Sequence, residues 1–235
     1  MLTTSQSQSA ELGVVIPVRH AGDHLYELLQ QFSDTNLSHQ IVVVNSGSTD
    51  LSDVTGEIAN VDLIESDRPG RGYQIRLGIE HLQTPWYLLL HADSILTGDW
   101  DKAITQFVSD TPDTDKAGYF DFHLDSSDRL ARILERLVNW RCHLLGLPYG
   151  DQGLLIPASL LTACGGVPDI PLMEDVHLAR RITRDRLKRI GVPLKTSAQH
   201  YQQHGYVKRC AQNLIFLCLF LAGVKPATLH RWYYS

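Results

Sequence analysis

One short apolar stretch constrains the fold of this chain more than any other: WYLLLHADS, at residues 86–94. Pro85 precedes it and Gly98 follows soon after. A run this short fits a strand buried on both faces better than a helix, which needs about ten residues or more. His91 and Asp93 would then lie at the carboxyl end of the strand. Because ligands of open α/β sheets bind outside the carboxyl ends of the strands, a functional site is expected here first.

Strand and helix patterns alternate in the rest of the first hundred residues. Short apolar runs predict strands at residues 13–18 and 40–45, and VDLIE at residues 61–65 is interpreted as a third strand. Between and after these strands, apolar residues recur at the spacing of amphipathic helices. This alternation predicts an α/β fold with a Rossmann-like, mostly parallel sheet and flanking helices.

Past Trp100 the pattern is less regular. A helix is expected near residues 101–109, and an alternating strand at 119–124 has the pattern of an antiparallel strand with one exposed face. Apolar residues from Leu130 to Leu137 mark a further helix, and another helix begins near Met173. The second half is therefore predicted to be mixed, with a helical C-terminal part.

Length and charge restrict the classes of protein that fit. A chain of 235 residues suits one large α/β domain, which we place at residues 13–205, after a loose tail at 1–12 and before a hydrophobic helical extension at 206–235. The net charge of -5 argues against a nucleic-acid-binding protein. The polar N-terminus shows no signal peptide, which predicts a cytoplasmic location.

The extension contains an apolar run at residues 214–224, flanked by Lys208, Arg209 and Lys225. A membrane span needs about 20 apolar residues, so this run is too short. It is either a helix packed on the domain or one that lies in a membrane interface, where Trp232 and its neighbouring tyrosines would be favourable. The second alternative predicts peripheral contact with the inner face of a membrane.

Carboxylates supply the clearest chemical signal. Asp93 at a strand end can hold a divalent cation, and His91 is a softer ligand nearby. Glu174 and Asp175 begin a helix, where acids also complement the helix dipole, and His91 can equally be a structural hydrogen-bonding residue. Asp175, with an ordinary pKa near 4, would be ionised at pH 7 and suited to accept a proton from a hydroxyl.

An arginine-rich loop precedes the helix that begins near residue 71. Its glycines, in GRGYQI at residues 70–75, do not complete a dinucleotide-binding fingerprint, and the chain has no phosphate-binding loop that ends in Gly-Lys-Ser/Thr. Arg68, Arg71 and Arg76 are nevertheless suited to bind a diphosphate, although the loop can also be a solvated basic turn.

These motifs, taken in order, resemble those of family 2 glycosyltransferases with the GT-A fold, and more narrowly a short bacterial subgroup whose strand-end motif is His-Ala-Asp. The resemblance covers residues 13–233, and the segments that carry it are VVIPV (14–18), IVVVNSGSTD (41–50), GRGYQ (70–74), LLHAD (89–93), GDQG (150–153) and PLMED (171–175).

The resemblance implies a role for each matching position. Donor-binding positions, for a nucleotide sugar, are Pro17, Arg19, Ser46, Asp50, Arg71, Ala92 and Asp93. It further implies that Mg²⁺ or Mn²⁺ is held by Asp93 with His91, that Asp175 is the general base beside Glu174, and that the acceptor side is formed by Gly150, Asp151 and Gln152. The acceptor would be a lipid or another small molecule with a hydroxyl group.

The implied reaction is an inverting transfer, in which the acceptor hydroxyl attacks the sugar as Asp175 removes its proton. Two positions depart from the family pattern: Asn45-Ser46 replaces an Asp-Asp pair, and His91 replaces the first aspartate of Asp-x-Asp. These departures leave a second hypothesis open, a non-catalytic sugar-nucleotide-binding or scaffold protein. A nucleotidyltransferase is a weaker alternative, because the first strand is not followed by a basic, glycine-rich loop.

Overall fold

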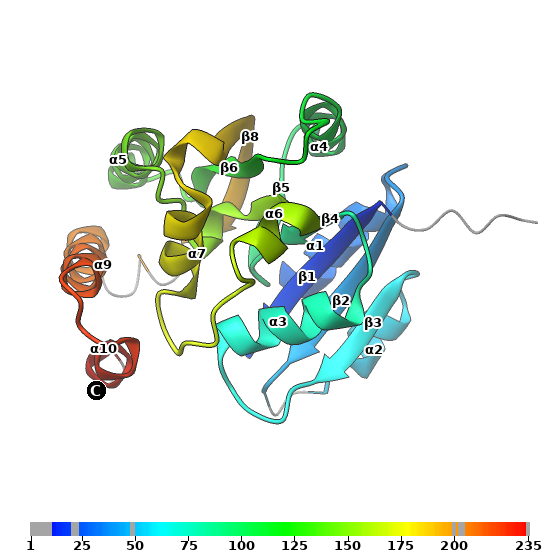
Figure 1. The fold of residues 1–235 in the computed structure, drawn as a ribbon, viewed down its shortest axis with the longest axis horizontal. Coiled ribbons are helices and arrows are strands. Elements are labelled where there is room, and N and C mark those ends of the chain that lie inside the picture. The colour runs from blue at the N-terminus through cyan, green and yellow to red at the C-terminus, as the bar shows by residue number, and fades with distance from the viewer. Residues whose placement is uncertain (1–10, 20–23, 48–49, 199–200, 202–204, 234–235) are drawn as a thin grey trace, which may run out of the picture.

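The computed structural model describes residues 11–19, 24–47, 50–198, 201 and 205–233. In these residues eight strands form one sheet, in the order β3-β2-β1-β4-β7-β6-β8-β5 (Figure 1). The strands are β1 (Leu12–Val18), β2 (His39–Asn45), β3 (Val61–Glu65), β4 (Trp86–Leu89), β5 (Ser94–Leu96), β6 (Ala117–Asp125), β7 (Leu154–Pro157) and β8 (Leu187–Ser197).

Helices cover both faces of this sheet (Figure 1). They are α1 (His24–Ser33), α2 (Ser52–Gly56), α3 (Arg71–His81), α4 (Trp100–Ser109), α5 (Arg129–Leu145), α6 (Ala158–Ala163), α7 (Glu174–Ile182), α9 (Tyr206–Leu221) and α10 (Pro226–Tyr233). Two short 3₁₀ turns, η1 (Gly150–Gln152) and η2 (Arg184–Arg186), complete the described elements.

The first half of the sheet is parallel, as the sequence predicts. β1 pairs in parallel with both β2 and β4, and β2 pairs in parallel with β3. β7 then runs antiparallel to β4 and β6, whereas β6 and β8 are parallel. The predicted α/β architecture is therefore confirmed, and the carboxyl ends of β1, β2 and β4 meet at one edge.

Alternate residues of the buried strands supply two separate cores. Val15 and Val44 pack in one cluster with residues of α3 and α7, whereas Val14, Ile16 and Val43 pack in another with α1 and α4. Strands buried on both faces need continuous apolar sequence, which explains why the central strands were recognisable.

The stretch at residues 86–94 is shorter as a strand than predicted. Trp86–Leu89 forms β4 and is buried throughout, but the strand ends there. His91 and Asp93 lie in a turn before β5, in which the Ser94 backbone N–H donates to the His91 carbonyl oxygen at 3.1 Å. Ser94 is fully buried and its Oγ accepts from the His91 N–H at 3.3 Å. These bonds close the turn, so the polar pair leaves the strand instead of extending it.

The C-terminal helices are half-buried. α9 buries Phe216, Leu217 and Phe220 against the core that α7 shares, but it exposes Leu214 and Ile215. The apolar run is therefore divided between packing and solvent. Among the described helices, none is both long enough and apolar enough to cross a membrane.

Candidate functional site

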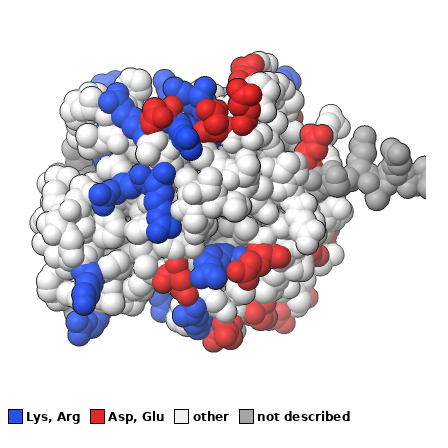
Figure 2. All heavy atoms as spheres, in the orientation of Figure 1, with Lys and Arg blue, Asp and Glu red and all other residues white. Residues whose placement is uncertain are grey.

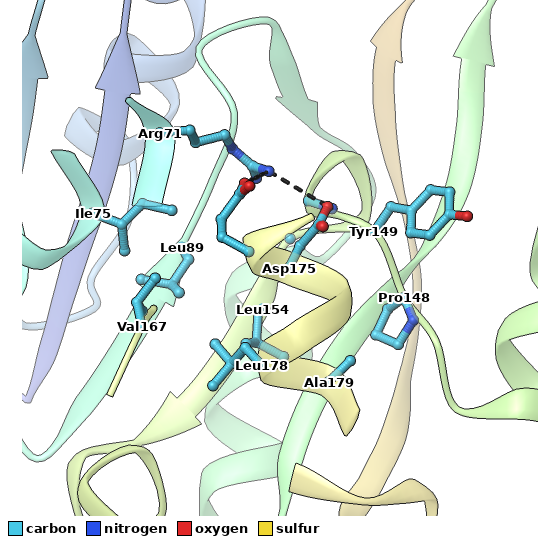
Figure 3. A pocket seen from close by; sticks show the side chains of 13 residues that line it. Arg71, Ile75, Leu89, Pro148, Tyr149, Leu154, Val167, Asp175, Leu178 and Ala179 are labelled. Carbon is cyan, nitrogen blue, oxygen red and sulfur yellow. Dashed lines mark hydrogen bonds and ion pairs between the residues drawn. The ribbon is translucent and has the colours of Figure 1, made fainter. Parts of the chain in front are cut away.

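Three segments meet in a helix-end cluster, which we define as Arg71, Asp151, Glu174 and Asp175. Arg71 is the first residue of α3, and its Nη1 donates to Glu174 Oε1 at 2.6 Å and lies 3.5 Å from Asp175 Oδ2 (Figure 3). The backbone N–H of Gly150 donates to the same Asp175 oxygen at 2.8 Å. One arginine thus links the N-termini of two helices with the η1 turn.

Backbone geometry makes this approach possible. Gly70, just before α3, has a φ of 144°, and Met173, just before α7, has a φ of 66°. A Cβ on Gly150 would lie 1.6 Å from Arg71 Nη2, so only glycine leaves room for the guanidinium. The glycine of the GDQG segment is therefore explained by contact with an arginine about eighty positions earlier.

Two carboxyls of the cluster, those of Glu174 and Asp151, have raised pKa values. Burial raises the pKa of Glu174, Arg71 opposes this shift, and Asp175 adds to it. Burial also raises the pKa of Asp151 to about 6, although the charge of Arg141 opposes the shift. Asp151 Oδ1 is buried and has no hydrogen-bond partner in the part of the chain that the structure describes. The site therefore holds one strongly paired acid and one acid with an unused oxygen.

An apolar crevice lies beneath the helix-end cluster. Its walls include Ile75, Leu89, Leu154, Val167 and Leu178 (Figure 3). Its free interior of about 30 Å³ is small, close to the volume of one water molecule. This apolar floor removes water from Glu174, which is why burial dominates the pKa of that carboxyl.

The strand-end turn, defined as His91 and Asp93, is a different kind of site. His91 Nδ1 lies 2.5 Å from Asp93 Oδ1. Burial raises the pKa of Asp93, but the hydrogen bond and charge of His91 outweigh it and leave the pKa below its usual value. His91 is also close enough to Asp151 to lower the pKa of that group, which places the turn and the cluster in one electrostatic neighbourhood.

Comparison with known proteins identifies the family. The sequence model of glycosyl transferase family 2 matches residues 13–142, more than half of the chain. The chain belongs to glycosyl transferase family 2. No characterised protein sequence matches it significantly. Its membership confirms the predicted resemblance to family 2 and makes the chain a glycosyltransferase in class, while the narrower His-Ala-Asp subgroup stays a prediction.

Solved structures show the same fold at low sequence identity. The crystal structure of S. aureus TarS 1-349 has 14% identity and a TM-score of 0.64, covering 93% of this chain and 68% of that one. A second structure of S. aureus TarS has 13% sequence identity and a TM-score of 0.62, and the match covers 93% of this chain and 41% of that one. The crystal structure of a mycobacterial protein has 16% sequence identity and a TM-score of 0.55, and the match covers 80% of this chain and 67% of that one. Together with the family, these matches confirm the predicted GT-A fold.

The predicted donor side of this glycosyltransferase is assembled at the ends of β1 and β2. The Ser46 N–H donates to the Val18 carbonyl oxygen at 2.9 Å, next to Arg19, while Pro17 is buried within β1. Asp50 is exposed and accepts from the Ser52 N–H at 2.9 Å just before α2, a local contact of the Asx-turn type. Ser48 and Thr49 of the predicted turn lie outside the described residues.

Divalent metal ions are common in this family, and the motifs predict that the strand-end turn holds one. No group of three or more His, Cys, Asp or Glu suited to hold a metal is found in the described ranges. Mg²⁺, however, is usually bound by one or two carboxylates together with substrate phosphates and water. Asp93 fits that role, since its low pKa keeps it ionised and His91 engages one of its two oxygens. Ala92 lies between them and packs on the core.

Two glutamines, Gln152 and Gln74, hold the backbone around the site through buried hydrogen bonds. Gln152 is fully buried, where its amide donates to the Phe120 carbonyl oxygen at 3.3 Å and accepts from Cys142 Sγ at 2.8 Å. Gln74, which the sequence reasoning missed, donates to the carbonyl oxygens of Val18 at 2.8 Å and Val44 at 2.7 Å. It lies one turn after Arg71 on α3, so it fixes the arginine relative to the donor side.

A stacked pair beside η1 was also missed. Arg141 lies over the Tyr149 ring at 3.7 Å, and burial raises the pKa of Tyr149 to about 12. Gly146, with a φ of 61°, ends α5 and turns the chain back so that the pair can meet. The Gly146 turn signal is visible in the sequence, but the pairing across it depends on the path of the loop.

Proposed function

We propose that this protein is an inverting glycosyltransferase that moves a sugar from a nucleotide-sugar donor to a hydroxyl acceptor, with Asp175 as the general base. The single observation that carries the proposal is the position of Asp175. Its carboxylate sits at the rim of the crevice, oriented by the Gly150 N–H at 2.8 Å. The UDP-GlcNAc bound in one similar structure, S. aureus TarS 1-349 with 14% identity and a TM-score of 0.63, makes UDP-sugars the first donors to test.

The chain's own residues would divide the work as follows. Asp175 accepts the proton of the acceptor hydroxyl as that oxygen bonds to the anomeric carbon, and the bond from that carbon to the diphosphate breaks, inverting its configuration. Arg71 is positioned to offset charge on the departing diphosphate. Glu174 holds Arg71 in place. Gly150 and Asp151 shape the acceptor side.

A divalent ion would be held by Asp93 with help from His91, and when bound it would stabilise the charge of the diphosphate. Pro17, Arg19, Ser46 and Asp50 would face the nucleoside, and Ala92 would line the diphosphate position. For the acceptor we propose a lipid or another small hydroxyl compound.

Donor turnover separates this proposal from a non-catalytic sugar-nucleotide-binding protein. A panel of nucleotide sugars, with and without Mn²⁺, is first screened by thermal shift, since a ligand that binds only the native state raises the melting temperature. The protein is then incubated with the best ligand, and release of the nucleoside diphosphate is measured. We expect slow hydrolysis that Asp175→Asn abolishes. Binding with no release at any protein concentration would support the scaffold alternative instead.

A further inference from the structure

α5 and α9 together present an apolar face that nothing in the described chain covers. The two helices pack on one another through Ala131, Leu134 and Tyr206, and they lie on the same side of the molecule (Figure 1). The exposed apolar residues are Leu130, Ile133, Leu137, Trp140 and Leu144 on α5, with Val207, Leu214, Ile215 and Leu221 on α9. Trp140 is 64% exposed and Leu137 is 58% exposed, values far from those of a core.

The spacing of these exposed residues places them along one side of each helix. On α5 they recur every three or four positions from 130 to 144, so they form one continuous stripe along the helix. Positions 207, 214 and 221 of α9 are seven apart and also share a face. Monomeric proteins rarely expose contiguous apolar patches of this extent unless the patch binds something.

The helices of this face are basic, although the whole chain has a net charge of -5. The cations on α5, α9 and α10 are Arg129, Arg132, Arg136, Arg141, Lys208, Arg209 and Arg231. On the described helices α5, α9 and α10, the one acid is Glu135, which is buried and paired with Arg132 at 3.0 Å. In Figure 2 the side of the molecule over α9 and α10 carries basic and uncharged residues.

A groove between α9 and α10 lies beside this face. Its volume is about 750 Å³, and it is lined by Lys208, Arg209, Gln212, Ile215, Phe216 and Tyr233. Two cations and an amide at one wall suit a phosphate group, and Ile215 and Phe216 suit the start of an acyl chain. The groove therefore matches a phospholipid headgroup in both charge and polarity.

From these observations we propose that the α5–α9 face and the α9–α10 groove dock the protein on an anionic bilayer surface. A second copy of the chain is the other natural occupant of an apolar face. In a two-fold dimer, however, the basic rim would meet itself, and like charges would oppose association. An anionic membrane satisfies both the apolar stripe and its basic rim, and the exposed Trp140 and Trp232 are suited to the bilayer interface. The sequence predicted membrane contact through the C-terminal extension alone, whereas this proposal adds α5 and a headgroup site between α9 and α10.

Vesicle binding tests this surface directly. The full chain is mixed with vesicles of phosphatidylcholine containing phosphatidylglycerol, or of phosphatidylcholine alone, and sedimented. Tryptophan emission is recorded in parallel, because Trp140 and Trp232 are exposed while Trp86 and Trp100 are buried. We expect binding and a shift of emission to shorter wavelength with the anionic vesicles. No sedimentation with either vesicle would overturn the proposal.

Paired variants locate the contact. Leu137→Gln with Trp140→Gln, or Leu214→Gln with Ile215→Gln, should weaken partitioning about tenfold or more, because each removes buried apolar groups from the bilayer. Lys208→Gln should weaken it about fivefold, and only with the anionic vesicles. Tyr26→Gln on α1 and Lys102→Gln on α4 are matched exposed controls and should bind normally.

Equal binding by the face variants and the wild type would overturn the proposal, as would a dimer in analytical ultracentrifugation that Leu137→Gln dissociates. Vesicle binding needs no sugar transfer. Its failure would therefore leave the role of Asp175 standing, and an inactive Asp175→Asn variant should still bind vesicles.

Discussion

The strand-end turn and the helix-end cluster both contain acids near a basic side chain, yet the pKa values of their acids are shifted in opposite directions. Asp93 is paired with His91 in a turn that solvent reaches, and its pKa is lowered. Glu174 and Asp151 are buried and both lie near the charge of Asp175, and their pKa values are raised even though Arg71 and Arg141 lie close by. Burial raises the pKa in both places, and the direction depends on whether the hydrogen bond and charge of the neighbouring cation outweigh it, as they do only at Asp93.

That difference suits two tasks. A metal ligand must remain ionised, which the turn ensures. A general base must lie where the acceptor hydroxyl can reach it, and Asp175 meets this requirement because it lines the crevice. We therefore propose that the strand-end turn holds the metal and that the helix-end cluster supplies the general base.

The largest expected effect is on the rate of transfer. Asp175→Asn retains the oxygen that accepts from the Gly150 N–H but cannot act as a base. Removing a general base costs about 10²–10⁴-fold in kcat, so transfer should nearly vanish while the melting temperature stays close to that of the wild type. Asp113→Asn, in an exposed loop, is the matched control. Normal transfer by Asp175→Asn would show that the cluster does not handle the proton.

The second prediction concerns the stability of the cluster. Arg71→Met leaves Glu174 buried without its partner, which should cost about 3 kcal/mol of unfolding free energy at pH 8. The raised pKa of Glu174 means that the folded state holds its proton more tightly than the unfolded state. The loss should therefore shrink as the pH falls towards 5 and Glu174 becomes neutral.

Urea unfolding at the two pH values measures this effect, and Glu174→Gln in the Arg71→Met background supplies the control. Because the double variant has no buried charge to compensate, it should recover most of the lost stability at pH 8. If the double variant is as unstable as Arg71→Met, the arginine contributes by packing and the ion pair is not the connection between the two helices.

A smaller effect is expected at Asp151. Its pKa of about 6 lies above the ordinary value near 4, so the folded state loses stability as the pH rises between these values. Asp151→Asn removes that titration and should gain up to about 3 kcal/mol relative to the wild type at pH 7, with little change at pH 4. Thermal unfolding between pH 4 and 8 measures it, with Asp115→Asn as an exposed control. Parallel curves for Asp151→Asn and wild type would contradict the raised pKa.

The contrast also shows what a sequence can predict about this fold. β3 was predicted at residues 61–65 and is observed at Val61–Glu65, because a short segment with β-branched and apolar residues between turns is a local signal. β8 was not predicted. It contains Gly191 and Pro193, which are unfavourable in strands, and it is held by pairing with β6, about seventy residues earlier. Strands stabilised by distant partners have no local pattern to reveal them.

The same limit applies to the site. Arg71, Asp93 and Asp175 were singled out by residue type and motif, but their roles stay predictions that the variants must test. The ion pair between Arg71 and Glu174 joins residues about a hundred positions apart, and the burial of Asp151 arises only when η1 packs under Arg141. The turn at His91 was predicted as strand because the buried hydrogen bonds of Ser94 are not visible in an apolar pattern.

The smallest effect is expected at the turn itself. Because the folded pKa of Asp93 is depressed, its contribution to stability is present above its unfolded pKa and is lost as the pH falls through the folded value. His91→Asn removes the main cause of the lowered pKa, so Asp93 should titrate at a higher pH. NMR of the Asp93 carboxyl as a function of pH measures this shift. Both side chains are partly exposed, 43% for His91 and 29% for Asp93, and solvent screening limits the stability loss to below about 1 kcal/mol. His81→Asn, which disrupts the exposed pair with Asp62, should leave the titration of Asp93 unchanged. An unchanged titration in His91→Asn as well would mean that the turn owes its low pKa to its backbone, and the contrast with the helix-end cluster would then no longer rest on His91.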